Sequence, residues 1–459
     1  MCKTVIFPID RTAKNAVALR KYTLRRCYMN SLTACQYVLF SLKEKLGSDA
    51  FLEQFKNPKA FTRKRLLSMR QVVFFLLNAS KRCMNIDISS IRWTLPSIRF
   101  PDVSKQAISK ARKGINPKLF KSLFRHSCET YFRFKGSRES WNGYYPYAID
   151  GSRIQVPKTK DNLSYFGSAA NQKARTLPAM AAVSLLYDLK NDIILDAALN
   201  NFNYAERSSA KDHLDYIEGC GLWHNALIIC DRGYPSYELY SRISEKGYYF
   251  LMRIQKNIPG LTKHVAAQCL GDVITDYRPA YIKEGDTVRI RIIRLTLESG
   301  KEEYLVTNLF DPSVTLKMFR ELYHMRWGVE SKYLELKSRL ELEEFTGACH
   351  TSVEQEFFIT VMLSNLSAMV KKDADRDVEW QCAGKKNRYA YQSNRSNIIG
   401  QMKEMLVPML CGEKDIGQIL DCIYKSAVRR RSQIQPDRKC KRPRIQLKRK
   451  HFNNRKTSM

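Results

Sequence analysis

Residues 177–199 have the sequence LPAMAAVSLLYDLKNDIILDAAL. An apolar run from Leu177 to Tyr187 is followed by a polar turn at 190–192 and a second apolar run from Ile193 to Leu199. Two apolar runs separated by a short polar turn predict a β-hairpin. Neither run alternates strictly between apolar and polar residues, which indicates strands buried on both faces.

The segments around this hairpin predict an alternation of strands and helices. A strand precedes it at Tyr144–Ile149, and helical patterns at 206–219 and 236–246 each precede another apolar strand, at 226–230 and 248–254. The predicted order is β-β-β-α-β-α-β. Such an order is typical of an α/β fold in which helices cover a mostly buried sheet.

The first 135 residues have a helical pattern. Apolar residues recur at three- and four-residue spacing over 32–46 and 61–78. Ser104 is placed to cap a short helix, and another helix is expected from Pro117, which gives a helix–turn–helix-like pair. Four basic residues of this pair would be available to phosphate: Lys105, Lys110, Arg112 and Lys113. The alternative interpretation is a basic, solvated face on a helical bundle.

The segments after residue 255 predict a small β-rich unit and then helices. Residues 256–315 interrupt the α/β pattern with Val288–Ile292, a Ser299–Gly300 turn and Tyr304–Asn308, as in an antiparallel insertion. A long helix carries residues 323–337. Further helices are expected at 354–370, 396–410 and 414–428, and the chain from residue 425 to 459 holds 14 Lys/Arg against one Asp. This tail resembles a disordered segment.

The charge of the chain points to a polyanionic partner. With 78 Lys+Arg and 45 Asp+Glu, the 459 residues carry a formal net charge of +33. Nucleic acid is the expected partner, and an anionic membrane surface is the alternative. No apolar run is long enough to span a bilayer, and no signal peptide is evident. The 13 cysteines contain no CxxC pair, which favours reduced thiols in a cytosolic protein.

Two aspartates follow apolar strands in the predicted core. Asp150 comes directly after Tyr144–Ile149, and Asp231 comes directly after Ala226–Cys230. Each is followed by a glycine within two residues, which would let the chain turn beneath a ligand. Either aspartate alone also fits a structural role at a strand-to-turn junction.

A third carboxylate lies in a four-residue pattern with the spacing Y-x2-R-x3-E-x6-K. The residues are Tyr323, Arg326, Glu330 and Lys337. On one continuous α-helix they fall at about 0°, 300°, 340° and 320°, hence on one face. Trp327 points about 100° away from this face, which favours core packing for its ring.

The three carboxylates together predict a metal site for phosphoryl transfer. Mg²⁺ prefers oxygen ligands. Two such ions about 4 Å apart activate the attacking oxygen and stabilise the leaving one. Asp150, Asp231 and Glu330 are the expected ligands, because two strand ends and one helix bring distant carboxylates together. A solvated helical Glu is the alternative interpretation of Glu330 taken alone.

These motifs resemble those of bacterial DDE transposases of the insertion-sequence-four type. The spacing around Glu330 is similar to their YREK signature, and Asp150-Gly and Asp231-Arg-Gly-Tyr are similar to their two aspartate boxes. The flanking sequence is similar as well, at residues 305–309, 342–347 and 355–356. The resemblance runs from about residue 60 to the end of the chain.

The resemblance implies a ribonuclease H-like catalytic core interrupted by a β-rich insertion. The implied divisions are a helical terminal-repeat-binding region (1–135), the core in two parts (136–255 and 316–375), the insertion (256–315), C-terminal helices (376–428) and a basic tail (429–459). It also implies two Mg²⁺ or Mn²⁺ ions and a homodimer synapsing double-stranded terminal inverted repeats with target DNA. We therefore expect a prokaryotic cytoplasmic, nucleoid-associated protein.

Carried over by residue, the resemblance makes Asp150, Asp231 and Glu330 the metal ligands. Tyr323, Arg326 and Lys337 would contact DNA near the cleavage site. Some members stack a flipped base on a Trp of the insertion during hairpin formation, whereas this chain has no Trp between residues 224 and 326. Three tyrosines offer a substitute π-face: Tyr277, Tyr281 and Tyr304.

The function expected from the sequence is cut-and-paste DNA transposition. Water would attack at the 3′ end of the element, and the freed 3′-OH would then attack target DNA. Two alternatives stay open at this point. One is a basic DNA-binding protein whose acidic residues are structural, and the other is a metal-dependent nuclease that cuts without joining.

Overall fold

The computed structural model describes residues 30–435, apart from short gaps at 63–65, 79, 137, 170–177, 223, 257, 259–260, 262–270, 284 and 298–299. Residues 1–29 of the expected DNA-binding region and residues 436–459 of the basic tail lie outside this range. So does Ser299 of the predicted turn. In the described part of the chain no helix is long and apolar enough to cross a membrane.

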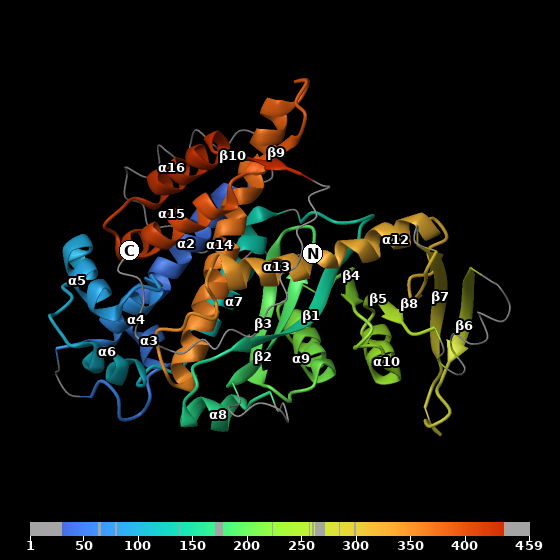
Figure 1. Cartoon of the computed structure of the whole chain (residues 1–459), viewed down its shortest axis with the longest axis horizontal. Helices are drawn as coiled ribbons and strands as arrows, with labels where there is room; N and C mark the ends of the chain where they lie inside the picture. The colour runs from blue at the N-terminus through green and yellow to red at the C-terminus, as the bar shows by residue number, and fades with distance from the viewer. Residues whose placement is uncertain are drawn as a thin grey trace, which may run out of the picture.

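An eight-stranded mixed sheet forms the centre of the molecule, in the order β3-β2-β1-β4-β5-β8-β7-β6 (Figure 1). β1 pairs antiparallel with β2 and parallel with β4, and β5 continues parallel to β4. The α/β prediction is therefore confirmed. The strands are β1 (Tyr145–Gln155), β2 (Met180–Asp188), β3 (Ile193–Asn201), β4 (Ala226–Cys230), β5 (Tyr249–Ile254), β6 (Asp272–Tyr277), β7 (Val288–Thr296) and β8 (Glu302–Thr307).

Helices cover both faces of the strands β4 and β5. Ile228 and Phe250 share one apolar cluster with helices α9 (Glu206–Gly219) and α10 (Tyr237–Glu245). The alternate residues Leu227 and Leu251 belong to a second cluster with α12 (Leu316–Met325). Since successive strand residues point to opposite faces, burial on both sides explains the unbroken apolar runs in the sequence.

The strands of residues 272–307 extend the central sheet. They are antiparallel as expected, but β8 pairs with β5, so β8, β7 and β6 add three strands to the core sheet (Figure 1). Of the two basic residues in Val288–Ile292, Arg289 is exposed, whereas Arg291 is buried and pairs with Asp272 of β6.

The N-terminal helices pack against the rest of the molecule. α2 (Ser31–Gly47) and α7 (Lys118–Lys135) both contact the 33-residue helix α14 (His350–Cys382), and one apolar cluster joins them to the sheet. Ser104 caps α6 (Lys105–Arg112) as predicted. The predicted helix from Phe61 begins only at Met69, where Ser68 and Gln71 form a capping box. The other helices of this region are α3 (Asp49–Glu53), α4 (Met69–Leu77), α5 (Met84–Thr94) and the 3-10 turn η1 (Pro96–Ile98).

The C-terminal helices appear where the sequence predicts them. They are α15 (Arg395–Cys411) and α16 (Ile416–Arg429). The start of the expected tail is structured, because β10 (Arg431–Ile434) pairs with β9 (Ala390–Ser393). Two further helices contact the central sheet: α8 (Lys160–Phe166) packs against β2 and β3, and α13 (Trp327–Ser338) packs against β1.

Candidate active site

Asp150 and Asp231 lie side by side on neighbouring parallel strands. The paired residues of β1 and β4 end at Ile149 opposite Cys230, and each aspartate is the next residue of its strand. Asp231 follows the end of β4, whereas Asp150 lies in the middle of β1, which continues to Gln155. The prediction of two strand ends is thus right for Asp231 and wrong for Asp150. The two aspartates are still neighbours, because each directly follows the last paired residues of β1 and β4.

The pattern around Glu330 spans two helices instead of one. α12 ends at Met325, α13 begins at Trp327, and Arg326 is the cap residue between them. The predicted single helical face is therefore interrupted. Gly328 permits a close approach of α13 to the sheet, since a Cβ there would lie 3.1 Å from the Leu189 side chain.

Arg326 links the helix junction to the carboxylates. Its Nη2 donates to Glu330 Oε1 at 3.0 Å, and its side chain is buried while that of Glu330 remains 34% exposed. Burial opposes the charge of Arg326, but Tyr323, Asp231, Glu330 and Asp150 together raise its pKa. The guanidinium therefore compensates part of the negative charge of these acids.

Burial is the main influence on the protonation of Asp150. Burial raises its pKa to about 6, and the neighbouring Glu330 and Asp231 carboxylates add to this rise, while Arg326 opposes it. Three oxygen-donor side chains with too little compensating charge fit a divalent cation chemically. Among the described residues, however, no three His, Cys, Asp or Glu side chains are grouped closely enough to hold a metal ion as they stand.

Lys337 lies apart from the other three residues of the motif. Its Nζ donates to Ser152 Oγ and to the Arg153 carbonyl oxygen, both at 2.8 Å, and burial lowers its pKa. It therefore sits along β1 on the far side of Asp150 from the helix junction. Tyr333, between them on α13, donates its hydroxyl to the Asp150 carbonyl oxygen at 2.8 Å.

The structure shows the exposure of two aromatic side chains at the helix junction, Tyr323 and Trp327. Tyr323 is buried and 6% exposed, and its hydroxyl has no hydrogen-bond partner in the described structure. Its contact with DNA stays a prediction. Trp327 is 48% exposed, so the prediction of core packing is wrong. The Arg326 guanidinium lies 5.4 Å from its ring centroid, which places an open π-face beside the site.

Only one of the three candidate stacking tyrosines is freely accessible. Tyr304 is buried at 1% exposure in β8, and Tyr277 packs edge-on against Tyr240 of α10. Tyr281 is 69% exposed.

Arg112, one of the four basic residues expected to face phosphate, is buried instead. It is 1% exposed, and its guanidinium donates to Gln355 Oε1 and Glu356 Oε1, both at 3.0 Å. Lys105, Lys110 and Lys113 are exposed as predicted. The apolar spacing of α6 could not reveal this, because the partners of Arg112 lie more than 240 residues away in the sequence.

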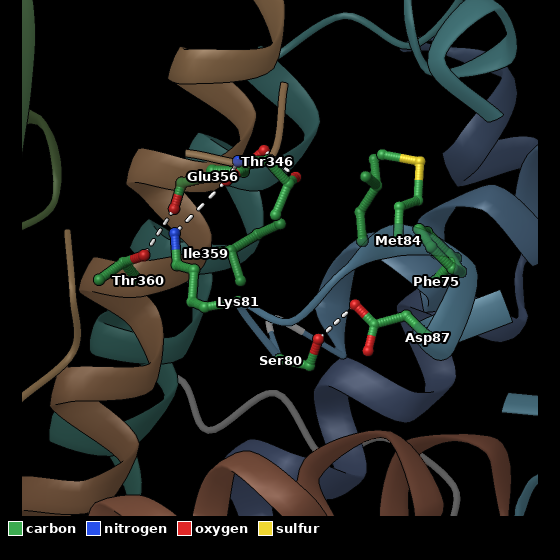
Figure 2. A pocket seen from close by; sticks show the side chains of 10 residues that line it. Phe75, Ser80, Lys81, Met84, Asp87, Thr346, Glu356, Ile359 and Thr360 are labelled. Carbon is green, nitrogen blue, oxygen red and sulfur yellow. Dashed lines mark hydrogen bonds and ion pairs between the residues drawn. The ribbon is translucent and has the colours of Figure 1, made fainter. Parts of the chain in front are cut away.

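Glu356 also lines a cavity of about 30 Å³, together with Lys81 and Thr346 (Figure 2). Lys81 Nζ lies 3.4 Å from Glu356 Oε2, and the Thr346 backbone N–H donates to the same oxygen at 2.8 Å. Burial raises the pKa of Glu356, but the neighbouring cations Lys81 and Arg112 outweigh this effect and lower the pKa to about 2. The cavity has room for about one water. We interpret it as a packed polar junction between the N-terminal helices and α14.

A Ser–His–Asp arrangement elsewhere is also structural. His213 Nδ1 lies 2.9 Å from Asp196 Oδ2, and its Nε2 lies 3.0 Å from Ser184 Oγ. The histidine is fully buried and the other two side chains nearly so. A nucleophile with no exposed atom to offer a substrate is not a hydrolytic site, so we assign these groups to packing of α9 on β2 and β3.

Comparison with known proteins confirms the transposase family that the motifs predicted. A protein-family model described as "Transposase DDE domain" matches residues 141–366. The putative transposase InsZ of Escherichia coli (strain K12) is 24% identical over 34% of this chain and 52% of its own length. The transposase InsG for insertion sequence element IS4, from the same organism, is 23% identical over 66% of this chain and 70% of its own length.

The match thus spans about half of InsZ and somewhat more of InsG. Among solved structures, a cryo-EM structure of the piggyBac transposase synaptic complex with hairpin DNA matches with a TM-score of 0.45 and 10% identity. That match covers 89% of this chain and 87% of the other.

Proposed function

We propose that this chain cuts DNA at the ends of its element and joins the freed 3′-OH to target DNA. The premise is that the chain belongs to the bacterial DDE transposases of the insertion-sequence-four type. The observation that carries the proposal is the adjacency of Asp150 and Asp231 on β1 and β4, with α13 bringing Glu330 and Arg326 to the same place. The sheet order β3-β2-β1-β4-β5, with β2 antiparallel, supports a ribonuclease H-like core.

Asp150, Asp231 and Glu330 would hold two divalent cations, Mg²⁺ or Mn²⁺. When bound, these ions would supply Lewis-acid activation of the attacking oxygen and charge stabilisation of the leaving oxygen. Glu330, which pairs with Arg326, would be the ligand whose negative charge is shared between an ion and this guanidinium. Arg326 would also be available to a DNA phosphate, for which its planar fork is suited.

Further parts of the proposal concern assembly and hairpin formation. We propose that two copies synapse a pair of terminal inverted repeats. If a hairpin intermediate forms, the exposed ring of Tyr281 is the stacking partner favoured among the three tyrosines. A strand-transfer assay with labelled element ends and a plasmid target separates a transposase, which joins, from a nuclease, which only cuts.

Replacing Arg326 or Lys337 with alanine should reduce cleavage far more than binding. Both side chains flank Asp150, so they position the reacting strand, while the rest of the basic surface holds the duplex. We expect cleavage of a labelled repeat to fall about a hundred-fold and the binding constant to change by less than about threefold. Arg320→Ala, an exposed arginine on α12, is the matched control and should cut normally. Normal cutting by a less stable Arg326→Ala protein would show that the face is structural.

Neutralising the exposed lysines of α6 and its C-terminal cap should erase the preference for the repeat. The variant replaces Lys105, Lys110 and Lys113 with Gln. It leaves the packed core intact, whereas a deletion of the N-terminal helices would remove buried residues.

Removing residues 436–459, which hold ten Lys/Arg and one Asp, should weaken binding to every DNA alike and flatten the salt dependence of binding. Competition between repeat and random duplexes measures both effects.

The matched control for the lysine variant replaces Lys385, Lys386 and Arg388 with Gln, since these exposed residues lie beyond α14. It should keep the preference. If the tail truncation loses the preference, or the Lys105, Lys110 and Lys113 variant retains it, the assignment of repeat recognition to the N-terminal helices is wrong.

A further inference from the structure

A fourth acidic side chain packs against both aspartate boxes. Glu206 is the first residue of α9, and its carboxylate lies where two glycines leave room. A Cβ at Gly151 would be 2.8 Å from Glu206 Oε1, and a Cβ at Gly233 would be 3.3 Å from Oε2. One glycine follows Asp150 directly and the other comes two residues after Asp231. The two carboxylate oxygens of Glu206 therefore face the two boxes.

This packing explains why glycine occupies both positions, and the explanation differs from the chain turn that the sequence suggested. Neither Gly151 nor Gly233 has a positive φ, and Gly151 lies within β1, so backbone freedom for a turn is not what these positions require. Space for an approaching group is the remaining reason for a residue without a Cβ. The group that approaches is the Glu206 carboxylate.

Two buried phenols adjoin the aspartate boxes: Tyr234 directly follows Gly233, and Tyr333 donates its hydroxyl to the Asp150 carbonyl oxygen at 2.8 Å. Tyr234 is 1% exposed, and its hydroxyl has no hydrogen-bond partner in the described part of the chain. Burial raises the pKa of Tyr234, and Cys230, Glu206, Tyr333 and Asp150 contribute to the rise. A buried hydroxyl without a partner, on the residue that directly follows Gly233, marks a place where a further polar group belongs.

We propose that Glu206 is a fourth acidic residue of the active site, which supplies an oxygen ligand, directly or through a water, to a divalent cation held by Asp150 and Asp231. This inference rests on the function proposed above. A carboxylate is a suitable donor for Mg²⁺ or Mn²⁺, and ions of this kind commonly keep waters that second carboxylates orient. The competing explanation is that Glu206 only stabilises the N-terminus of α9 through the helix dipole.

The test is Mn²⁺ binding by the full chain in complex with a duplex from the end of its element, measured by calorimetry. Glu206→Gln keeps the size of the side chain and removes its charge, and we expect the affinity for Mn²⁺ to fall about tenfold. Cleavage at limiting Mg²⁺ should fall in parallel and recover at saturating Mg²⁺. Glu218→Gln, near the other end of the same helix in a surface pair with Lys246, is the matched control and should bind Mn²⁺ normally.

Gly151→Ala is an independent variant that leaves Glu206 in the sequence but pushes its carboxylate away. It should lower Mn²⁺ affinity as Glu206→Gln does, and Gly233→Ala should have a smaller effect because its contact is longer. Wild-type Mn²⁺ affinity in Glu206→Gln, with only a lower melting temperature, would overturn the inference in favour of the helix-dipole role. Failure of the wild-type protein itself to bind Mn²⁺ and cleave would instead contradict the proposed function.

Discussion

Replacing Asp150, Asp231 or Glu330 with its amide or with alanine should abolish DNA cleavage and leave DNA binding nearly unchanged. Each change removes an oxygen ligand from a site where metal ions would contribute several kcal/mol of transition-state stabilisation, which corresponds to a loss of about a thousand-fold or more in rate. Duplex affinity depends on the basic surface, which these changes leave in place.

The measurement is cleavage of a labelled terminal repeat alongside a gel-shift titration of the same DNA. Glu321→Gln is the matched control, since this exposed glutamate lies on α12 close in sequence to the motif. It should cut normally. Near-normal cleavage by Glu330→Gln in Mg²⁺ would remove Glu330 from the site, and loss of DNA binding in all three variants would show that the acids are structural.

Replacing Lys332 with Met should destabilise the fold by about 3 kcal/mol, because it removes one of the two cations that compensate a pair of acids and leaves a net negative charge at this junction. Lys332 is 2% exposed on α13, and its Nζ lies 2.7 Å from Asp192 Oδ1 and 3.2 Å from Glu335 Oε1. Arg395 of α15 pairs with the same two acids. The four charges form one balanced network that joins α13, the β2–β3 turn and the C-terminal helices.

Urea unfolding of the full chain checks this result. Lys425→Met is the control, since Lys425 pairs with Asp421 on the exposed surface of α16 and should cost less than about 1 kcal/mol. Because Lys332 lies two residues from Glu330, the folded fraction of Lys332→Met should also cut more slowly than wild type. A change in stability as small as that of the control would show that the network does not hold α13 in place.

Much of the fold followed from local sequence pattern. The β2–β3 hairpin and the strand at 226–230 appear as predicted, since both are long apolar runs bounded by polar turns. α9 matches its predicted range of 206–219, which has helical periodicity. The pairing of β8 with β5 had no such signal, because partners in a sheet are chosen by tertiary packing and not by the strand's own residues.

The site was predictable as a set of residue types but not as an arrangement. Asp150, Asp231 and Glu330 stood out by their position and spacing, whereas the junction at Arg326 and the exposure of Trp327 depend on how α13 crosses the sheet. Glu206 carried no motif of its own. Its signal was indirect, in the glycines after each aspartate, and only the structure shows which carboxylate fills that space.

Metal-dependent cleavage is tested most directly by incubating the purified full chain with a labelled duplex from the end of its element, in Mg²⁺ alone and in Mg²⁺ with excess chelator. We predict strand cleavage at the element end that releases a 3′-OH in Mg²⁺, none with chelator, and equal DNA binding in both. Binding without cleavage in Mg²⁺ and in Mn²⁺, or cleavage that survives the chelator, would contradict the assignment of Asp150, Asp231 and Glu330 to a metal-dependent transposase site.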